Sequence, residues 1–292
     1  MFFKKYYDKR DGAIRGYDMH SRSSRVLSVL IMLMCVVMVM IALFPIVWVF
    51  LAAFKDIKDF NTNVSLLPSH FDFAGVAKTW GQLKFSKFYV NSIILVVGSV
   101  FCAILFNGLL AYGLAVLKPK GYKVIQALVM WSLLIPSTAS IVALFRNINM
   151  LGMSRSFLPL WLAYGANAFW VVLFKEFFEE LPTELLEAAR LDGCGTLQVF
   201  LKMVLPLSKP IIMVVAIFAV TTSWSDFLLP YLVLNGSGKE TVMVKLFSFK
   251  DTPTNAVAML RAVMFSIIPP TILFVLFQKQ ITDGAAAGAV KG

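Results

Sequence analysis

Six long apolar stretches constrain the fold of this chain more than any other feature. About 20 mostly apolar residues are enough to cross the hydrocarbon core of a bilayer. The stretches run approximately over residues 27–54, 89–116, 124–145, 157–174, 211–234 and 256–277. Backbone polar groups in lipid must be satisfied within the chain, which favours helices. We therefore expect an all-α integral membrane protein with six transmembrane helices.

Composition supports a membrane protein and argues against a nucleic-acid partner. Hydrophobic residues make up 59% of the chain and charged residues 15%, whereas soluble domains are nearer one half and one quarter. The net charge of +11 comes from basic residues in short loops beside apolar stretches, as expected of topology signals. The three cysteines form no Cys-x-x-Cys pair, and His20 and His70 lie far apart, so the sequence predicts no metal site.

Two of the stretches need comment. The first has an apolar run too long for a signal peptide and lacks a clean small-x-small cleavage site, so we interpret it as a retained anchor. The fourth contains Gly165 and Asn167, which interrupt its apolar pattern and make it the least regular span.

Lysine and arginine near the span ends predict the orientation. The segment before the first span is strongly basic, and the tight loop 117–123 carries Lys118, Lys120 and Lys123. We therefore expect both termini and the loops 117–123 and 175–210 in the cytoplasm, and the loops 55–88, 146–156 and 235–255 outside. The predicted organisation is a cytoplasmic segment 1–26, a permease domain 27–280 and a cytoplasmic tail 281–292, extended from Asp283.

The loop 175–210 is polar and amphipathic, and its residues predict a first short helix. Pro182 suits a first helical turn, where its missing N–H costs nothing. Glu184 and Glu187 fall in early turns, where the helix dipole favours negative charge. Gly193 supplies a residue that ends a helix in the left-handed conformation.

A second helix is predicted to follow. Thr196 is placed to cap its first turn, and Pro206 and Pro210 are expected to end it and to start the fifth span. The residues Leu197, Phe200, Leu201 and Val204 recur at the spacing of one helical face. Spacing alone leaves two interpretations open, a pair of helices that projects from the membrane and a hairpin that lies on the lipid surface.

Residue identities in this loop resemble the EAA loop of ABC-importer permeases. That pattern is E-A-A, three residues, G, nine residues, I-x-L-P. The matching residues are Glu187, Ala188, Ala189, Gly193, Leu205 and Pro206, with Met203 in place of the isoleucine. Further segments resemble the carbohydrate-importer branch, in particular the six-span subunit of the maltose permease. They are Asn91-Ser92, Ala111-Tyr112, Lys118–Gly121, Ile135-Pro136, Trp224–Pro230 and Gly288–Gly292. The resemblance covers about residues 26–292.

The resemblance implies a coupling helix that docks on a partner ATPase. The residues that it assigns to coupling are Glu187, Ala188, Ala189, Arg190, Asp192, Gly193, Leu205 and Pro206. It implies two cytoplasmic ATPase subunits that bind ATP and Mg²⁺, a second and unlike permease subunit, and an extracytoplasmic solute-binding protein. The substrate would be a sugar or oligosaccharide, and the location the cell membrane. The chain itself has no Walker A motif, so it is expected to be neither an enzyme nor a cofactor-binding protein.

Two further contacts follow from the resemblance. The outer loop 235–255, with its tip Asn235, Gly236, Ser237 and Gly238, matches a loop that reaches into the binding protein. Its glycines suggest a flexible tip, and a plain connector remains the less favoured alternative. The terminal residues Val290, Lys291 and Gly292 resemble a tail placed at the ATPase dimer interface.

Polar residues within spans are costly in lipid and usually face protein or water. The candidate translocation-pathway residues are Tyr164, Asn167, Trp170, Trp224, Ser225 and Asp226. The three aromatic side chains suit stacking on sugar rings, but interfacial belts and helix packing explain them as well. Asp226 is expected in the outer half of the fifth span.

Other transporter classes remain as alternatives. An ABC-importer permease for a non-sugar solute would share the EAA loop. A secondary transporter should show inverted repeats and intramembrane charge pairs, and neither is visible in the sequence.

Overall fold

The computed structural model describes residues 22–249 and 255–289, and throughout these residues it contains helices and no strands. The chain divides into two compact units, residues 1–73 and 74–292. All six expected spans are helical, which confirms the all-α fold. Three of the six, however, are broken by irregular residues.

In its described residues, the first unit contains one long helix, one short helix and a polar loop. Helix α1 (Arg22–Ala53) is apolar throughout the span predicted for it, and α2 (Ile57–Thr62) follows. The loop after α2 folds around Asp59, whose carboxylate accepts hydrogen bonds from the Ser69 hydroxyl at 2.6 Å, the Ser69 N–H at 3.0 Å and the Asn63 amide at 3.0 Å. These bonds, together with the nearby Lys55 ammonium, lower the pKa of Asp59 to about 2.

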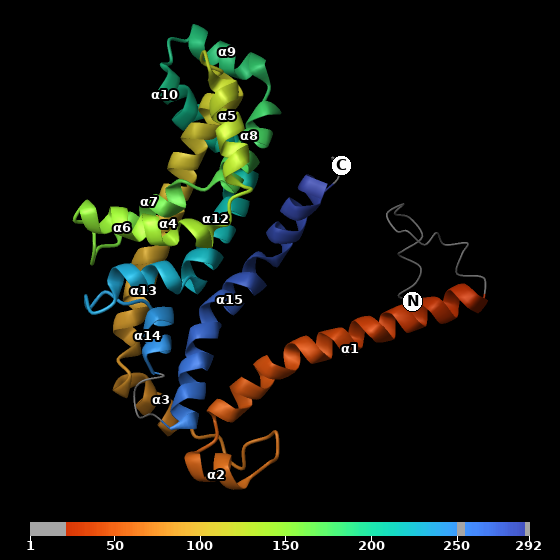
Figure 1. Ribbon diagram of the computed structural model, residues 1–292. Coiled ribbons are helices and arrows are strands. Elements are labelled where there is room, and N and C mark those ends of the chain that lie inside the picture. Colours follow the sequence, from red (N-terminus) through yellow and green to blue (C-terminus); the bar gives the residue numbers. More distant parts are fainter. Residues whose placement is uncertain (1–21, 250–254, 290–292) are drawn as a thin grey trace. The chain divides into compact units, whose positions relative to one another are not determined.

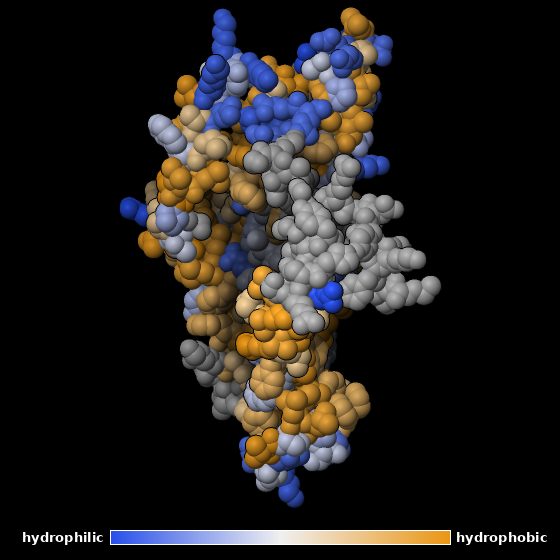
Figure 2. All heavy atoms as spheres, turned by 90° about the vertical axis from the view of Figure 1, so that its right-hand side faces the viewer, coloured by the Kyte–Doolittle hydropathy of each residue, from blue (hydrophilic) through white to orange (hydrophobic). Residues whose placement is uncertain are grey.

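The second unit is built around α4 (Phe85–Tyr112), which continues as a π-helical segment, η3 (Gly113–Leu117). A short helix, α3 (Phe73–Gln82), precedes it. Figure 1 shows α9 and α10 near one end of α4 and α3 and α14 near the other. Figure 2 shows hydrophilic residues gathered at the α9 end and many hydrophobic residues on the coloured part of the face below it.

The third span is divided in two. Its halves are α5 (Tyr122–Ser132) and α6 (Ser137–Met150), and they are separated by residues 133–136. The expectation of one helix over 124–145 is therefore wrong. Pro136 explains the break, because proline lacks a backbone N–H and disfavours the helical conformation in the residue before it.

The fourth and fifth spans are also broken. Helices α7 (Leu158–Gly165) and α8 (Ala168–Glu179) meet at an angle of 45°, so the interruption expected at Gly165 and Asn167 is confirmed. Helix α12 (Lys209–Ser225) is followed by α13 (Leu228–Leu234), and Asp226 lies between them. A single helix over 211–234 is thus not observed.

The remaining helices complete the second unit. Helix α14 (Val242–Ser248) lies within the predicted loop 235–255. Helix α15 (Ala256–Ala289) contains the sixth span and continues beyond it, so the tail is helical as far as Ala289 and not extended from Asp283. By length and composition, three helices of the described residues can cross a membrane unbroken, and counting each sharply bent pair as one span raises this number to five.

Candidate functional site

The predicted coupling helix is present as α9 (Thr183–Leu191). Pro182 precedes its first residue, and Gly193 beyond its end has φ +82°. The Gly193 N–H donates to the Arg190 carbonyl at 3.0 Å, and the Cys194 N–H donates to the Ala189 carbonyl at 3.0 Å. This pair of bonds is a Schellman motif, which requires the left-handed residue that glycine adopts without strain. The predicted helix end at Gly193 is confirmed.

Helix α9 has one buried and one exposed face. Leu186 and Ala189 are buried, whereas Glu187, Arg190 and Leu191 are exposed, Leu191 at 89%. Of the other coupling residues assigned by resemblance, Ala188, Asp192 and Pro206 are exposed and Leu205 is half-buried. This polar and partly apolar exposed face is free for contact with another protein.

The second helix of the loop differs from the prediction in two respects. It begins as α10 (Thr196–Val199), and its N-cap is Gly195, whose N–H donates to the Gln198 side chain at 3.0 Å. Thr196 is thus the first helical residue and not the cap. Phe200 and Val204 are buried as expected, but Leu197 and Leu201 are 58% and 47% exposed. The prediction of a single apolar face is wrong, because the side chain of Val199, rather than that of Leu197 or Leu201, is buried in the core.

This helix does not end at Pro206. It continues through a π-helical segment, η4 (Phe200–Val204), into α11 (Leu205–Leu207). Residues 196–207 then meet α12 at an angle of 84°, with Ser208 at the corner. The coupling loop is therefore joined to the fifth span by a sharp corner rather than by a flexible connector.

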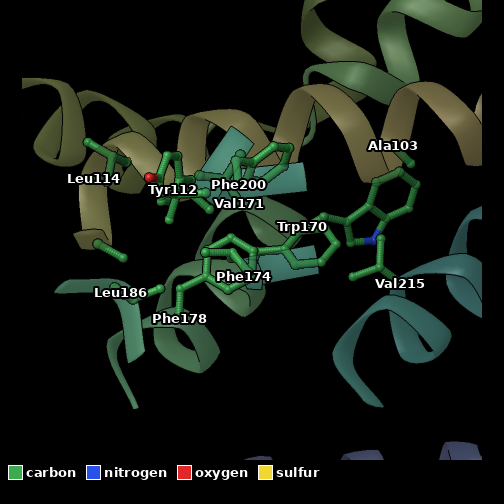
Figure 3. Close-up of a cluster of buried hydrophobic side chains, with 14 of the residues drawn as sticks. Ala103, Tyr112, Leu114, Trp170, Val171, Phe174, Phe178, Leu186, Phe200 and Val215 are labelled. Atoms are coloured by element: carbon green, nitrogen blue, oxygen red, sulfur yellow. The ribbon is translucent and has the colours of Figure 1, made fainter. Parts of the chain in front are cut away.

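A buried aromatic cluster lies beneath the coupling loop. Figure 3 shows side chains from α4, η3, α8, the coupling loop and α12 meeting there. The buried members from these elements include Tyr112, Leu114, Phe174, Phe178, Leu186, Val199, Phe200 and Val204. Within it, the rings of Phe174 and Phe178 are 5.5 Å apart. The coupling loop is thus packed against spans at its inner face.

The break between α7 and α8 is held by an asparagine that sequence reasoning missed. Asn107 of α4 is fully buried. Its amide donates to the Tyr164 carbonyl at 3.0 Å, and its oxygen accepts from the Asn167 N–H at 2.8 Å. Asn167 caps α8 by accepting from the Trp170 N–H at 3.2 Å. A polar side chain inside the second span was the available signal for Asn107.

Among the candidate pathway residues, Tyr164 and Asp226 are brought together. The Tyr164 hydroxyl donates to the Asp226 carboxylate at 3.1 Å. Asp226 therefore lies at the gap between α12 and α13, where it links the fourth and fifth spans. Ser225 beside it is exposed.

Both candidate tryptophans lie inside the protein. Trp170 is 3% exposed, and its ring stacks on that of Tyr164 at 6.2 Å. The Trp224 indole N–H donates to the Ser266 carbonyl at 3.1 Å, and its ring contacts that of Tyr89 at 5.5 Å. This burial favours helix packing over sugar stacking for both residues.

The tip of the loop between α13 and α14 is tied to α4. The Asn91 amide donates to the Glu240 carbonyl at 2.9 Å and to the Gly238 carbonyl at 3.3 Å. The Val242 N–H donates to the Ser92 hydroxyl at 2.9 Å. Gly236 and Gly238 have positive φ, so they set the path of the backbone. The tip is therefore hydrogen-bonded to α4 at Gly238, while its flexibility and its contact with a binding protein stay predictions.

A second loop joins this one. The Arg155 N–H donates to the Val233 carbonyl at 2.9 Å, and the Lys239 ammonium donates to the Arg155 carbonyl at 3.1 Å. The loop 151–157 and the residues 235–241 between α13 and α14 are therefore joined by hydrogen bonds. The tail residues Val290, Lys291 and Gly292 lie outside the described residues.

Comparison with known proteins places these features in context. Residues 103–284 match the family model described as binding-protein-dependent transport system inner membrane component. A probable ABC transporter permease protein, YurM of Bacillus subtilis (strain 168), is 30% identical over 85% of this chain and 84% of its own length. The arabinooligosaccharides transport system permease protein AraQ of the same organism is 28% identical over 94% of this chain and 99% of its own length.

A solved structure shares the fold. It is described as a bacterial ABC transporter involved in the import of the acidic polysaccharide alginate, and the matched chain is 23% identical with a TM-score of 0.80. The similarity covers 89% of the present chain and 98% of the other.

Proposed function

We propose that this chain, which belongs to the family of binding-protein-dependent transport system inner membrane components, is the permease subunit of an ATP-driven importer of sugars or oligosaccharides. The observation that carries the proposal is the coupling loop. Its EAA sequence forms α9, which ends at Gly193 in a fixed Schellman motif and packs its inner face on the spans. An exposed helix anchored in this way transmits force from a partner into the membrane domain.

The substrate class rests on the relatives. AraQ, similar along almost its whole length, is named for the transport of arabinooligosaccharides. The chain also carries Trp224–Pro230 and Gly288–Gly292, which resemble the carbohydrate-importer branch. We therefore propose an oligosaccharide as substrate, delivered by an extracytoplasmic binding protein, and a second, unlike permease subunit as partner.

The energy comes from partner subunits. ATP and Mg²⁺ bind to two cytoplasmic ATPases, and closure of the ATPase dimer shifts α9, with Glu187 as its polar contact and Gly193 fixing its angle. The shift passes through the 84° corner at Ser208 into α12. With both termini in the cytoplasm, alternating access then exposes the pathway to one side of the membrane at a time. The terminal residues Val290–Gly292 are proposed to contact the ATPase interface.

The pathway side of the proposal rests on Asp226 and Tyr164. They are the candidate polar residues that meet between two spans, at a gap in the helical backbone. A carboxylate hydrogen-bonded to a phenol at such a gap offers the acceptors and the donor that sugar hydroxyls need. Rearrangement of α12 changes this pair directly, because Asp226 follows its last residue.

Reconstitution of the whole complex tests the function. We would assemble this chain with its second permease, ATPase and binding protein, and record ATP hydrolysis with maltotriose, raffinose, arabinotriose and diacetylchitobiose. Amino acids, a polyamine and phosphate serve as controls. Stimulation by a glycan alone is expected, stimulation by a non-sugar would retain the importer and reject the carbohydrate, and failure to bind an ATPase would reject the importer.

Variants of the coupling helix test the mechanism. Glu187→Ala and Gly193→Asp should leave insertion intact and reduce substrate-stimulated hydrolysis by roughly tenfold. Glu187 is exposed, so its loss affects docking more than folding, while Asp at position 193 strains the left-handed turn. Glu184→Ala, one turn earlier and equally exposed, is the matched control. Wild-type stimulation in the Gly193→Asp complex would reject α9 as the coupling helix.

A further inference from the structure

One side chain of α4 holds a full turn of the second coupling-loop helix. The Tyr112 hydroxyl donates to the Thr196 carbonyl at 3.3 Å, and the Tyr112 ring lies 5.3 Å from that of Phe200. Thr196 and Phe200 are four residues apart, which is about one helical turn. Tyr112 is 2% exposed and Phe200 is fully buried, and Figure 3 shows the two side chains together.

Phe200 also approaches the backbone of α4 closely. A Cβ atom added to Gly108 would lie 3.4 Å from the tip of the Phe200 ring. Gly108 is four residues before Tyr112, so the two residues lie on the same face of α4. The ring of Phe200 therefore sits against a shallow recess in α4, with Tyr112 beside it.

The contact is flanked by one π-helical segment after α4 and another after α10. Immediately after Tyr112, α4 becomes η3, in which the Lys118 N–H donates to the Gly113 carbonyl at 2.9 Å. On the other side η4 begins at Phe200 itself, whose carbonyl accepts from the Leu205 N–H. π-helical turns are rare and occur frequently at functional positions. Two of them thus meet at one aromatic contact.

The position of this contact between α9 and α4 indicates its role. Helix α9 is joined to α10 by the short turn 192–195 and contacts it. A displacement of α9 is therefore passed on to α10, and Phe200 is the first residue after α10. We propose that Tyr112 and Phe200 are positioning residues that carry the displacement of the coupling loop to α4. The inference rests on the proposed permease function.

The test uses the complete complex in proteoliposomes, with the binding protein loaded with whichever oligosaccharide stimulates the wild type. Tyr112→Leu, Phe200→Leu and the double variant are compared for basal ATP hydrolysis, stimulated hydrolysis and sugar transported per ATP. Each single variant should assemble with the ATPase and keep its basal rate, but its stimulation and its transport per ATP should fall about tenfold.

Two further variants separate coupling from packing. The double variant should lose no more than either single one, because the shared contact is already broken. Tyr112→Phe keeps the ring contact and loses the hydroxyl, so most of the stimulation should remain. The matched control is Phe85→Leu at the opposite end of α4, where Phe85 is buried and its ring lies 5.1 Å from that of Phe265. It should lower the melting temperature and leave transport per ATP unchanged.

Two results would overturn the proposal. One is wild-type stimulation and transport per ATP in both Leu variants, and the other is an equal loss of coupling in Phe85→Leu, which would indicate a general effect of destabilisation. A wild-type complex that no loaded binding protein stimulates would instead overturn the proposed function itself.

Discussion

The two ends of α4 are held by different kinds of interaction. At the α14 end, Asn91 donates hydrogen bonds to the backbone of the loop before α14, and Ser92 accepts one from Val242, the first residue of α14. At the α9 end, Tyr112 and Phe200 meet through their rings and one long hydrogen bond, beside two π-helical segments. The α14 end therefore adds directional hydrogen bonds to apolar contacts such as that of Phe85 with Phe265, whereas the α9 end relies mainly on apolar contact.

This difference indicates which end of α4 can shift against its neighbours. A hydrogen bond weakens steeply with misalignment, so the loop on Asn91 cannot slide without losing its partners. Apolar contact is non-directional and tolerates small shifts, and π-helical turns can absorb a change in helical register. An importer that is driven from the α9 end needs this asymmetry.

The largest expected effect on stability comes from separating α4 from α7, which packs against the part of α4 between its two ends. A Cβ atom at Gly98 would lie 2.2–2.6 Å from atoms of the Trp161 indole, whose N–H donates to the Leu95 carbonyl at 3.2 Å. The indole cannot shift without losing that bond. Gly98→Ala should therefore destabilise the protein by about 3 kcal/mol, the upper part of the range for overpacking, measured by thermal melting in detergent.

Gly113→Ala is the matched control for this substitution. Gly113 also lies in the α4–η3 helix, and no atom stands within 4 Å of a Cβ added there, so the change should be neutral or slightly stabilising. Equal melting temperatures for Gly98→Ala and wild type would show that α7 is not packed as closely as described.

A smaller effect is expected from releasing the polar end alone. Asn91→Ala leaves the Gly238 and Glu240 carbonyls without their donor, at a cost of about 1–3 kcal/mol. Hydrogen exchange of residues 236–242 should rise while basal ATP hydrolysis stays unchanged. Val90→Ala, an exposed neighbour, serves as the control. Unaltered exchange in Asn91→Ala would remove the basis for calling this end fixed.

The smallest effect is expected at the polar loop around Asp59. It tests whether hydrogen bonds also hold a loop in place elsewhere in the protein. Its folded pKa of about 2 lies below the ordinary value of 3.8, so the ionised form is stabilised by folding. This contribution is complete above about pH 4 and is lost as the pH falls through about 2. A nitroxide on Val64→Cys, in a background without other cysteines, should become mobile over that interval.

Two variants sharpen this pH experiment. Asp59→Asn should give a mobile label at every pH, because the charge that holds the Ser69 hydroxyl and N–H is absent. His70→Gln removes the imidazole whose Nε2 lies 3.5 Å from the Asp56 carboxylate, and it should leave the acid transition in place. A label that stays immobile at pH 2 in the wild type would contradict the role of Asp59.

The sequence predicted features that depend on local chemistry. The helix over Thr183–Leu191 and its end at Gly193 follow from glycine conformation and charge placement. The break at Asn167 follows from polar residues within an apolar run. These properties belong to a few consecutive residues, so no knowledge of the rest of the fold was needed.

Other features depend on partners distant in the sequence. The role of Asn107 appears only when α4 meets the α7–α8 break, 60 residues along the chain from Asn107 to Asn167. The π-helical segments shift the register of the side chains that follow, and the burial of Val199 rather than Leu197 depends on what α10 meets. Periodicity assumes a regular α-helix and no neighbours, so it places Leu197 and Leu201 incorrectly.

The corner at Ser208 turns residues 196–225 into a lever with two arms, residues 196–207 and α12. Its long arm, α12, has 17 residues and is about 26 Å long at 1.5 Å per residue. A rotation of about 10° around the corner would move the far end of such an arm by about 4–5 Å. That travel exceeds the 3.1 Å that joins the Tyr164 hydroxyl to Asp226. A rotation of this size at Ser208 would thus part Asp226 from Tyr164 if Tyr164 stayed in place.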